Sequence, residues 1–353
     1  MSKTPPSGVI RLLDASLNRA SEGARVIEDY ARFVLGDGHL SRLAKEVRHD
    51  LAQAGSAIPM DQRLAARDTP GDVGTTISTA AEGERADAWR VCLASLGRLQ
   101  EAIRSLEEYS KTIEPALGAE FEGLRYRVYT LAKGLGATRR GQERLGSARL
   151  YVLIDGGDSA DDFAARTEAI AAAGVDVLQL RDKRLDDRTL VERAQLLATI
   201  CRQHGVISIV NDRADIARAA CADGVHVGQE ELSVADARAV LGPYAIVGVS
   251  THAIEQAREA VLSGADYLGV GPTFPSQTKS FDAFPGLDYV QQVAEEITLP
   301  AFAIGGITAE NLSQVRDAGV SRVAVSSAIT ASEDPSTAVQ RLAERLGEAV
   351  KKS

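Results

Sequence analysis

The chain has 353 residues, of which 44% are hydrophobic and 25% charged, and its formal net charge is −9. This composition is typical of a globular protein long enough for two domains. The negative charge argues against nucleic acid or an anionic membrane as the main partner; no apolar run reaches membrane-spanning length, and residues 1–8 are polar, unlike a signal peptide.

Apolar residues recur every three or four positions in the first part of the chain, which predicts amphipathic helices. The predicted helices cover residues 10–34, 40–54, 89–106 and 121–135, with an irregular segment over 58–79. Residues 1–140 are therefore predicted to form an all-α helical-bundle domain. The glycines at positions 134, 136, 141 and 146 predict a linker before a second domain, residues 147–353.

Short β-branched runs alternate with helical ones in the second domain. The predicted strands are residues 150–154, 175–180, 206–210, 224–227, 245–249, 267–270, 301–304 and 320–325. The predicted helices are 161–173, 187–204, 234–241, 254–263, 287–296, 309–318 and 335–350. Eight strands alternating with helices predict an α/β (β/α)8 TIM barrel, and an open doubly wound sheet is the competing fold.

The three cysteines are Cys92, Cys201 and Cys221, an odd number without C-x-x-C spacing. They are interpreted as buried thiols of a cytoplasmic protein, because a reducing compartment keeps cysteines unpaired.

Polar residues follow the second and third predicted strands, where a (β/α)8 barrel builds its site. Alternation places Gln179, Arg181 and Lys183 on one side, and such groups suit a diphosphate and a ring heteroatom. A solvated charged turn is the alternative. Asn211 and Asp212 follow the third strand, where they suit Mg²⁺ or, equally, the N-cap of the next helix.

The segments after the fourth and fifth strands add further candidates. Glu231 is a second carboxylate for Mg²⁺, although acidic residues at a helix start would explain it as well. Ser250 offers a hydroxyl, and His252 is interpreted as a structural or capping residue.

A loop rich in glycine, proline and hydroxyl residues, 271–279, follows the sixth strand. The hydroxyls of Ser276 and Thr278 and the charge of Lys279 suit phosphate binding, whereas a plain connection is the alternative.

Gly306 follows the seventh strand, and Ser326 and Ser327 follow the eighth. Loops at these two positions often bind phosphate in this fold. The sequence thus predicts two anion sites in one barrel mouth, without a Ser-His-Asp arrangement or a P-loop lysine motif. These features favour a transferase that joins two phosphorylated small molecules and releases diphosphate.

From about Ala148 onward, the chain closely resembles the thiamine phosphate synthases, also called thiamine-phosphate pyrophosphorylases. The matching motifs follow the strands in order: Gln179-Leu-Arg-Asp-Lys183, Asn211-Asp-Arg213, Asp223-Gly-Val-His-Val-Gly-Gln229, Gly248-Val-Ser250, Pro275-Ser-Gln-Thr-Lys279, Gly305-Gly-Ile307 and Ser326-Ser327. The resemblance implies an enzyme of thiamine biosynthesis. Such an enzyme couples a hydroxymethylpyrimidine diphosphate to a thiazole phosphate, giving thiamine phosphate and diphosphate through a pyrimidine-methyl cation.

The resemblance also implies a role for each motif residue. Those around the pyrimidine diphosphate would be Gln179, Arg181, Lys183, Asn211 and Ser250, with Lys279, Ser250 and Arg181 as the catalytic groups. Those around the thiazole phosphate would be Ser276, Thr278, Gly306, Ser326 and Ser327. Asp212 and Glu231 would hold Mg²⁺. The family usually has Gly-Gln-Glu-Asp where this chain has Gly228-Gln-Glu-Glu231, so Glu231, one methylene longer, would shift its backbone or bind through water.

Two alternatives to the synthase remain at this point. A thiazole tautomerase, a related barrel, would not need the diphosphate and metal residues. A non-catalytic sensor or scaffold of the thiamine pathway would bind ligand without releasing diphosphate.

The first half resembles the helical extension that precedes the barrel in some synthases, through residues 17–30, 67–74 and 101–108. Kinase activity on the pyrimidine precursor is one hypothesis for it, but no nucleotide-binding loop supports that activity. An anion pocket formed by Arg19, Arg25, Arg67 and Arg104 is the alternative to a lattice of salt bridges. The favoured interpretation is bundle packing, or oligomerisation into a homo-oligomer.

Overall fold

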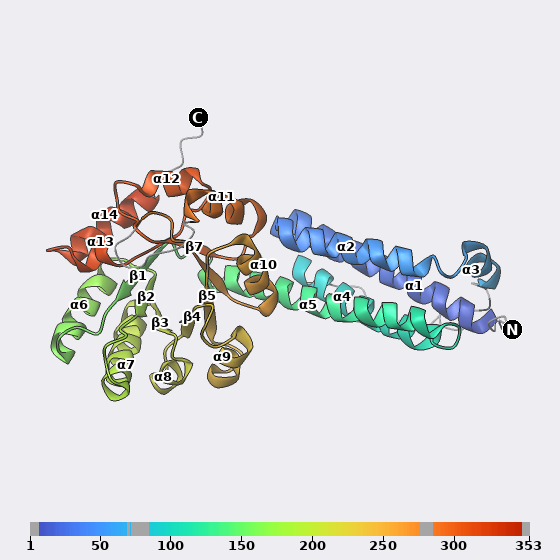
Figure 1. The fold of residues 1–353 in the computed structure, drawn as a ribbon, viewed down its shortest axis with the longest axis horizontal. Helices are drawn as coiled ribbons and strands as arrows, with labels where there is room; N and C mark the ends of the chain where they lie inside the picture. Colours follow the sequence, from blue (N-terminus) through green and yellow to red (C-terminus); the bar gives the residue numbers. More distant parts are fainter. Residues whose placement is uncertain (1–6, 69–70, 72–84, 276–284, 348–353) are drawn as a thin grey trace. The chain divides into compact units, whose positions relative to one another are not determined.

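The computed structural model describes residues 7–68, 71, 85–275 and 285–347. It divides into two compact units, residues 1–135 and 136–353. The first unit is helical, as predicted (Figure 1). Its elements are α1 (Ser7–Asp29), the π-helical turn η1 (Tyr30–Leu35), α2 (Gly38–Gly55), α3 (Met60–Ala66), α4 (Ala88–Ser110) and the first part of α5 (Pro115–Leu145).

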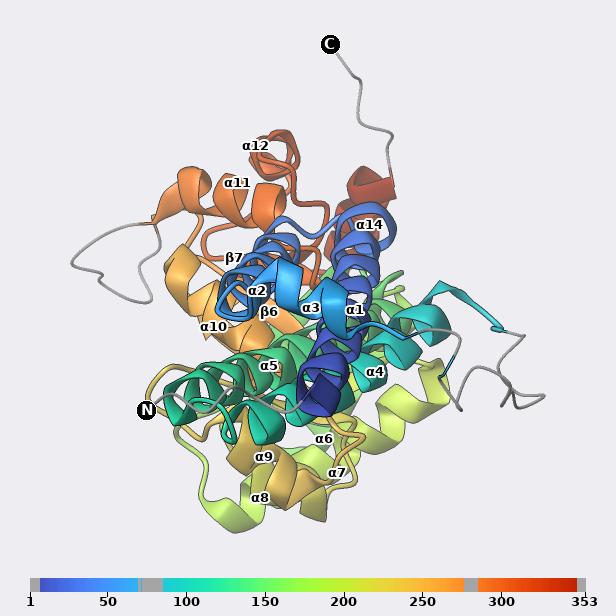
Figure 2. The same ribbon diagram turned by 90° about the vertical axis from the view of Figure 1, so that its right-hand side faces the viewer.

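The helices of the first unit pack through the apolar stripes that the sequence predicts. In α1 the buried positions include Leu13, Leu17, Ala20, Ala24 and Ile27, spaced three or four apart. Helix α1 packs against α2 and α4, and the view along the bundle shows α1, α2, α4 and α5 nearly end-on (Figure 2). The bundle prediction is therefore confirmed.

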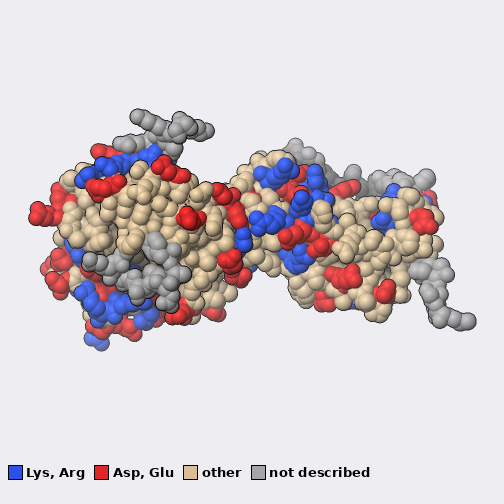
Figure 3. All heavy atoms as spheres, turned by 45° about the horizontal axis from the view of Figure 1, so that its top comes forward, with Lys and Arg blue, Asp and Glu red and all other residues tan. Residues whose placement is uncertain are grey.

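Basic side chains of this unit pair with acidic ones. Buried Glu107 on α4 accepts a hydrogen bond from Arg125 Nε at 2.7 Å and lies 2.8 Å from Arg104. Arg67 contacts Asp14 with two nitrogens, at 2.5 and 3.1 Å. Lys and Arg lie beside Asp and Glu on the face shown in Figure 3. These pairs favour the salt-bridge interpretation over the anion pocket.

The second unit is a closed parallel barrel in the strand order β1 to β8. The strands are β1 (Leu150–Ile154), β2 (Val177–Leu180), β3 (Ile207–Asn211), β4 (Gly224–Val227), β5 (Ile246–Thr251), β6 (Tyr267–Val270), β7 (Ala301–Ile304) and β8 (Val323–Val325). The helices are α6 (Ala160–Ala172), α7 (Asp187–His204), α8 (Ala214–Ala219), α9 (Val234–Leu241), α10 (Ile254–Ser263), α11 (Gly286–Glu296), α12 (Leu312–Asp317), α13 (Ser327–Thr330) and α14 (Pro335–Gly347). The predicted (β/α)8 barrel is confirmed, and the short helix α8 is an addition to the prediction.

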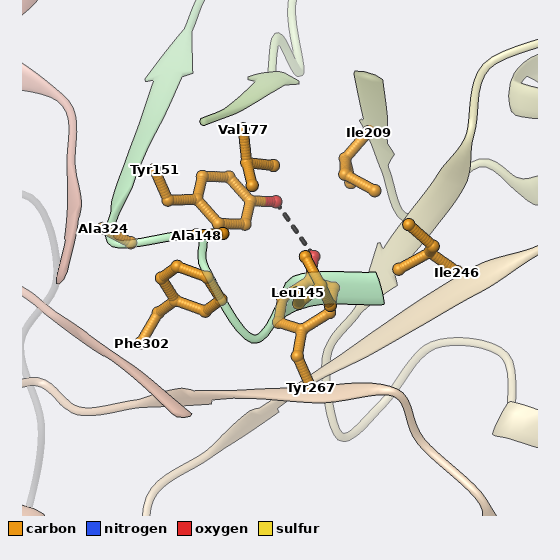
Figure 4. Packing of buried hydrophobic residues seen from close by; sticks show 9 residues of the cluster. All are labelled: Leu145, Ala148, Tyr151, Val177, Ile209, Ile246, Tyr267, Phe302 and Ala324. Carbon is orange, nitrogen blue, oxygen red and sulfur yellow. Dashed lines mark hydrogen bonds between the residues drawn. The ribbon is translucent and has the colours of Figure 1, made fainter. Parts of the chain in front are cut away.

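The segment predicted to be a linker is helical instead, because α5 continues to Leu145. Leu145 belongs to the buried cluster inside the barrel, with Tyr151, Tyr267 and Phe302 (Figure 4). Arg140 Nε also donates to Asp266 at 2.7 Å. The last turns of α5 thus close one end of the barrel.

Gly248 in β5 makes room for a large side chain inside the barrel. A Cβ at this position would lie 2.0 Å from Cζ of Tyr267, its neighbour in the paired strand β6. We expect Gly248→Ala to lower the free energy of unfolding by about 1–3 kcal/mol, the usual effect of overpacking a filled core. Urea unfolding measures this change.

Gly97→Ala is the control for Gly248→Ala, because a Cβ on Gly97 meets nothing within 4 Å. Alanine also favours a helix interior, so we expect no loss of stability there. Equal stability of the Gly248→Ala and wild-type proteins would show that the ring of Tyr267 shifts without penalty.

Two expectations about chemical environment have different outcomes. Cys92 and Cys201 are buried, and burial raises the pKa of each thiol to about 12. Cys221 is exposed, so the prediction of a buried thiol is wrong there: it follows a short helix at the barrel surface.

Among the described helices, none is both long and apolar enough to span a membrane.

Candidate active site

A cavity of about 580 Å³ opens where the barrel strands end. It is lined by seven of the predicted site residues: Gln179, Arg181, Asn211, Ser250, Gly306, Ser326 and Ser327. They come from the ends of β2, β3, β5, β7 and β8. The barrel therefore brings distant parts of the sequence into one cavity at the ends of its strands, as expected for a (β/α)8 fold.

Three other predicted residues are described but do not line this cavity: Lys183, Asp212 and Glu231. The remaining three, Ser276, Thr278 and Lys279, lie outside the described residues.

Asp212 occupies a tight turn at the end of β3. Its φ angle is 61°, and Arg213 N donates to Asn211 O at 2.7 Å across it, as in a γ-turn. Such a conformation costs about 1–3 kcal/mol and is commonest at functional positions. The N-cap alternative fails, because the N-cap residue of α8 is Arg213, and its side chain makes no capping hydrogen bond. Lys183 Nζ lies 3.4 Å from Asp212 Oδ2.

The Glu231 side chain folds back over the end of β4. A Cβ on Gly228 would meet Glu231 Oε2 at 2.2 Å, so the glycine leaves room for the carboxylate. The next helix, α9, begins at Val234, three residues later, and is capped by Ser233. The helix-start explanation of Glu231 is therefore not supported.

A continuous set of hydrogen bonds crosses the barrel interior and joins five side chains that line the cavity. Gln179 Nε2 donates to Tyr151 Oη at 2.9 Å, and the two tyrosine hydroxyls, of Tyr151 and Tyr267, are 2.9 Å apart. His226 Nδ1 lies 3.0 Å from Tyr267 Oη, and its Nε2 lies 2.8 Å from Ser250 Oγ. Five side chains from β1, β2, β4, β5 and β6 are thus linked.

Burial controls the protonation of this set. It lowers the pKa of His226 to about 4, and the positive charge of Arg181 acts in the same direction. Burial also raises the pKa of both Tyr151 and Tyr267. The imidazole and both phenols are therefore neutral at pH 7.

The loops after β6 and β7 line the cavity together with the residues that follow β8. Gly305 and Gly306 both have positive φ angles, 104° and 63°, which glycine adopts at no steric cost. Thr273 N and Phe274 N donate to Ile304 O and Gly305 O, at 2.8 and 3.0 Å. The loops after β6 and β7 therefore hold each other in place beside the serines that follow β8.

Four cavity or interior residues had no role in the sequence analysis: Tyr151, Asp155, His226 and Tyr267. Asp155 directly follows β1 and lines the cavity. Although burial opposes the effect, a hydrogen bond from Arg166 at 2.7 Å lowers the pKa of this carboxyl. Because Asp155 follows the first strand directly, the expectation that site residues follow strands could have identified it from the sequence. His252 also lines the cavity, and its Nδ1 contacts Gly271 O at 2.5 Å, in agreement with a structural role.

Comparisons with known proteins cover both parts of the chain. A model of the thiamine monophosphate synthase family matches residues 150–329, and a model of the ThiD2 family matches residues 11–134. The chain is 48% identical over 338 residues to a thiamine-phosphate synthase of Rhodopirellula baltica, covering 93% of this chain and 90% of the relative. A Synechocystis thiamine-phosphate synthase is 42% identical over 346 residues, 98% of each chain.

A solved structure agrees with these relatives. The thiamine phosphate pyrophosphorylase from Pyrococcus furiosus is 30% identical and has a TM-score of 0.53. It covers 60% of this chain, and 99% of its own chain is matched. The predicted synthase is therefore confirmed over the tautomerase and the non-catalytic sensor. The chain belongs to the thiamine-phosphate synthase family and is a transferase that forms thiamine phosphate.

Proposed function

We propose that the cavity binds the pyrimidine diphosphate on one side and the thiazole phosphate on the other. The observation that carries this proposal is the distribution of polar groups in one cavity. Gln179, Arg181 and Asn211 lie at the ends of neighbouring strands β2 and β3, whereas Ser326 and Ser327 follow β8. Both substrates are anionic, and a cation with amide and hydroxyl groups suits them.

The roles of the side chains follow from a dissociative displacement. Breakage of the C–O bond to diphosphate would leave a pyrimidine-methyl cation and a leaving group with added negative charge. Arg181 and Lys183 would neutralise that charge, and Lys279 would join them. The apolar side chains of Phe302 and Ile304 in the cavity lining would help to exclude water, which otherwise traps the cation.

We propose that Asp212 and Glu231, which follow β3 and β4, would hold Mg²⁺. Mg²⁺ is bound in proteins by one or two carboxylates, with substrate phosphates and water completing its shell. Asp212 and Glu231 supply two such carboxylates, and the described residues contain no cluster of three or more ligating side chains. When bound, the ion supplies positive charge to the leaving diphosphate.

Asp212→Asn is expected to raise the Mg²⁺ concentration needed for half-maximal activity at least about tenfold, because it removes one of two charged oxygen ligands. The measurement is diphosphate release as a function of Mg²⁺ at saturating concentrations of both substrates. Asp187→Asn is the matched control, since Asp187 is an exposed carboxylate whose partner is Arg213. An unchanged Mg²⁺ requirement in Asp212→Asn would remove Asp212 from the proposed metal site.

The two-substrate proposal is tested by binding and product release. Each substrate alone is expected to protect the protein against thermal unfolding, and both together with Mg²⁺ are expected to release diphosphate. The Ser326→Ala, Ser327→Ala double variant should raise KM for the thiazole phosphate and leave KM for the pyrimidine diphosphate unchanged. A rise in both KM values would contradict the separation into two sides.

The proposal extends to the remaining parts of the molecule. The bundle, residues 1–135, would form a domain separate from the synthase domain, residues 136–353, and would serve in packing or in assembly of a homo-oligomer. A cytoplasmic location remains a prediction from the cysteine pattern.

A further inference from the structure

The hydrogen-bonded side chains from Gln179 to Ser250, here called the interior chain, have one direction of donation when Gln179 Nε2 faces Tyr151 Oη. Gln179 Nε2 is a donor without acceptor capacity, so Tyr151 Oη accepts from it. The single hydroxyl hydrogen of Tyr151 then goes to Tyr267 Oη. If Tyr267 donated to Tyr151 instead, Tyr151 Oη would accept two hydrogen bonds. The hydroxyl hydrogen of Tyr151 would then have no acceptor among the described contacts.

The same direction continues to the histidine. With Tyr151 donating to it, the Tyr267 hydroxyl uses its own hydrogen on His226 Nδ1, 3.0 Å away. That nitrogen must therefore be unprotonated. A neutral imidazole has one hydrogen, which then lies on Nε2 and is donated to Ser250 Oγ at 2.8 Å.

We propose that the interior chain fixes His226 as the Nε2-protonated tautomer and thereby makes the Ser250 hydroxyl a hydrogen-bond donor into the cavity. Tyr151, Tyr267 and His226 are positioning residues in this arrangement. The proposal rests on the proposed role of Ser250 at the substrate. The group that Ser250 meets is an acceptor, such as a diphosphate oxygen or an unprotonated ring nitrogen of the pyrimidine.

In this arrangement Ser250 and His226 do not form a nucleophile and general base, although the distance between them would allow it. A serine hydroxyl 2.8 Å from an imidazole nitrogen has the geometry of a nucleophile and its general base. A protonated Nε2 cannot accept the serine proton, so Ser250 acts by donation and not as a nucleophile. Gly269 supports this placement, since a Cβ there would lie 3.1 Å from Cε1 of His226 and displace the ring.

The tautomer is measured directly by ¹⁵N NMR of the full-length protein labelled at its histidines. The chain has five histidines, and the spectrum of a His226→Gln variant assigns the resonances of His226. We expect Nε2 to carry the proton and Nδ1 to be unprotonated at neutral pH. A protonated Nδ1 would overturn the proposal, because it reverses the direction of the interior chain.

The effect on catalysis is measured with Tyr267→Phe, which removes the donor to His226 Nδ1. We expect kcat/KM to fall about tenfold, equivalent to about 1.4 kcal/mol and to the net contribution of one hydrogen bond. The Tyr289→Phe variant is the control. Tyr289 is a buried barrel tyrosine whose hydroxyl donates to Thr251 Oγ1 at 2.6 Å, outside the interior chain. It should leave kcat/KM within about twofold of the wild type, the range of a substitution away from reacting groups.

A double-variant cycle separates positioning from general loss of stability. In a Ser250→Ala background, Tyr267→Phe should lower kcat/KM no further, because the interior chain acts through the missing hydroxyl. The same tenfold loss in both backgrounds would overturn the proposal. If Ser250→Ala alone leaves kcat/KM unchanged, the proposed substrate role of Ser250 fails, whereas the NMR result still decides the tautomer.

Discussion

Replacing Arg181 by alanine is expected to lower the single-turnover rate of diphosphate release about 100- to 1000-fold, the usual effect of removing one preorganised charge-stabilising donor. Among the described residues that line the cavity, Arg181 is the only lysine or arginine. Its backbone is held at the end of β2 by a hydrogen bond from its N to Ile154 O at 2.8 Å. Besides burial, its charge lowers the pKa of the partly buried His226, so it acts on the cavity interior.

Two further variants test whether the effect belongs to this guanidinium. Arg181→Lys keeps the charge but loses bidentate contact with a phosphate, so we expect an intermediate rate. Arg184→Ala is the matched control from the same loop. Arg184 is 74% exposed, pairs with the buried carboxylate of Asp182 at 2.8 Å and does not line the cavity, so its loss should change the rate less than about threefold. A near-normal rate in Arg181→Ala would place leaving-group stabilisation elsewhere.

Asp266→Ala is expected to lower the free energy of unfolding by about 3–5 kcal/mol, the effect of breaking a buried ion pair from one side. The Asp266 carboxylate is fully buried and accepts from Arg140 Nε on α5 at 2.7 Å and from Arg238 on α9 at 2.6 Å. Val247 N in β5 donates to it as well, at 2.9 Å. Its loss leaves two partly buried guanidinium groups without their charged partner and the buried Val247 N–H without its side-chain acceptor.

Urea unfolding measures the Asp266 effect against an exposed ion pair of the same unit. Glu310→Ala removes the partner of Arg341, and both side chains of that pair are more than half exposed. We expect Glu310→Ala to change stability by about 0–1 kcal/mol. Similar losses in the two variants would mean that Asp266 contributes no more than a surface charge.

The sequence predicts the barrel and much of its cavity because both follow from local patterns. Alternation along a strand places Gln179 and Arg181 on the same side, and parallel strands bring their ends to one face of the barrel. Ser250 and Ser326 follow from the same rule. These residues required no knowledge of distant contacts.

The interior chain could not be predicted in this way, because its partners meet across the barrel. Tyr151 and Tyr267 are 116 positions apart, and neither lies at the C-terminal end of its strand, where the site residues are expected. An apolar strand with one tyrosine gives no sign of the partner that its hydroxyl meets. Only the closed barrel brings the two hydroxyls together.

The false linker has a similar cause. Glycines usually indicate a loop, but Gly141 lies within α5, where a Cβ would be 2.3 Å from Asp266 O. Glycine is required there by close packing of the helix on the barrel, not by a need for flexibility. Composition alone does not distinguish these two uses of glycine.

The packing of Leu145 and Arg140 against the barrel sets where this gene can be divided. The last turns of α5, which close one end of the barrel, precede the first strand and lie within residues 136–145. A gene fragment that starts at the first strand encodes a barrel that lacks the helix turns covering this end. Recombination that exchanges the N-terminal half therefore preserves the synthase barrel only when the crossover falls upstream of Gly136.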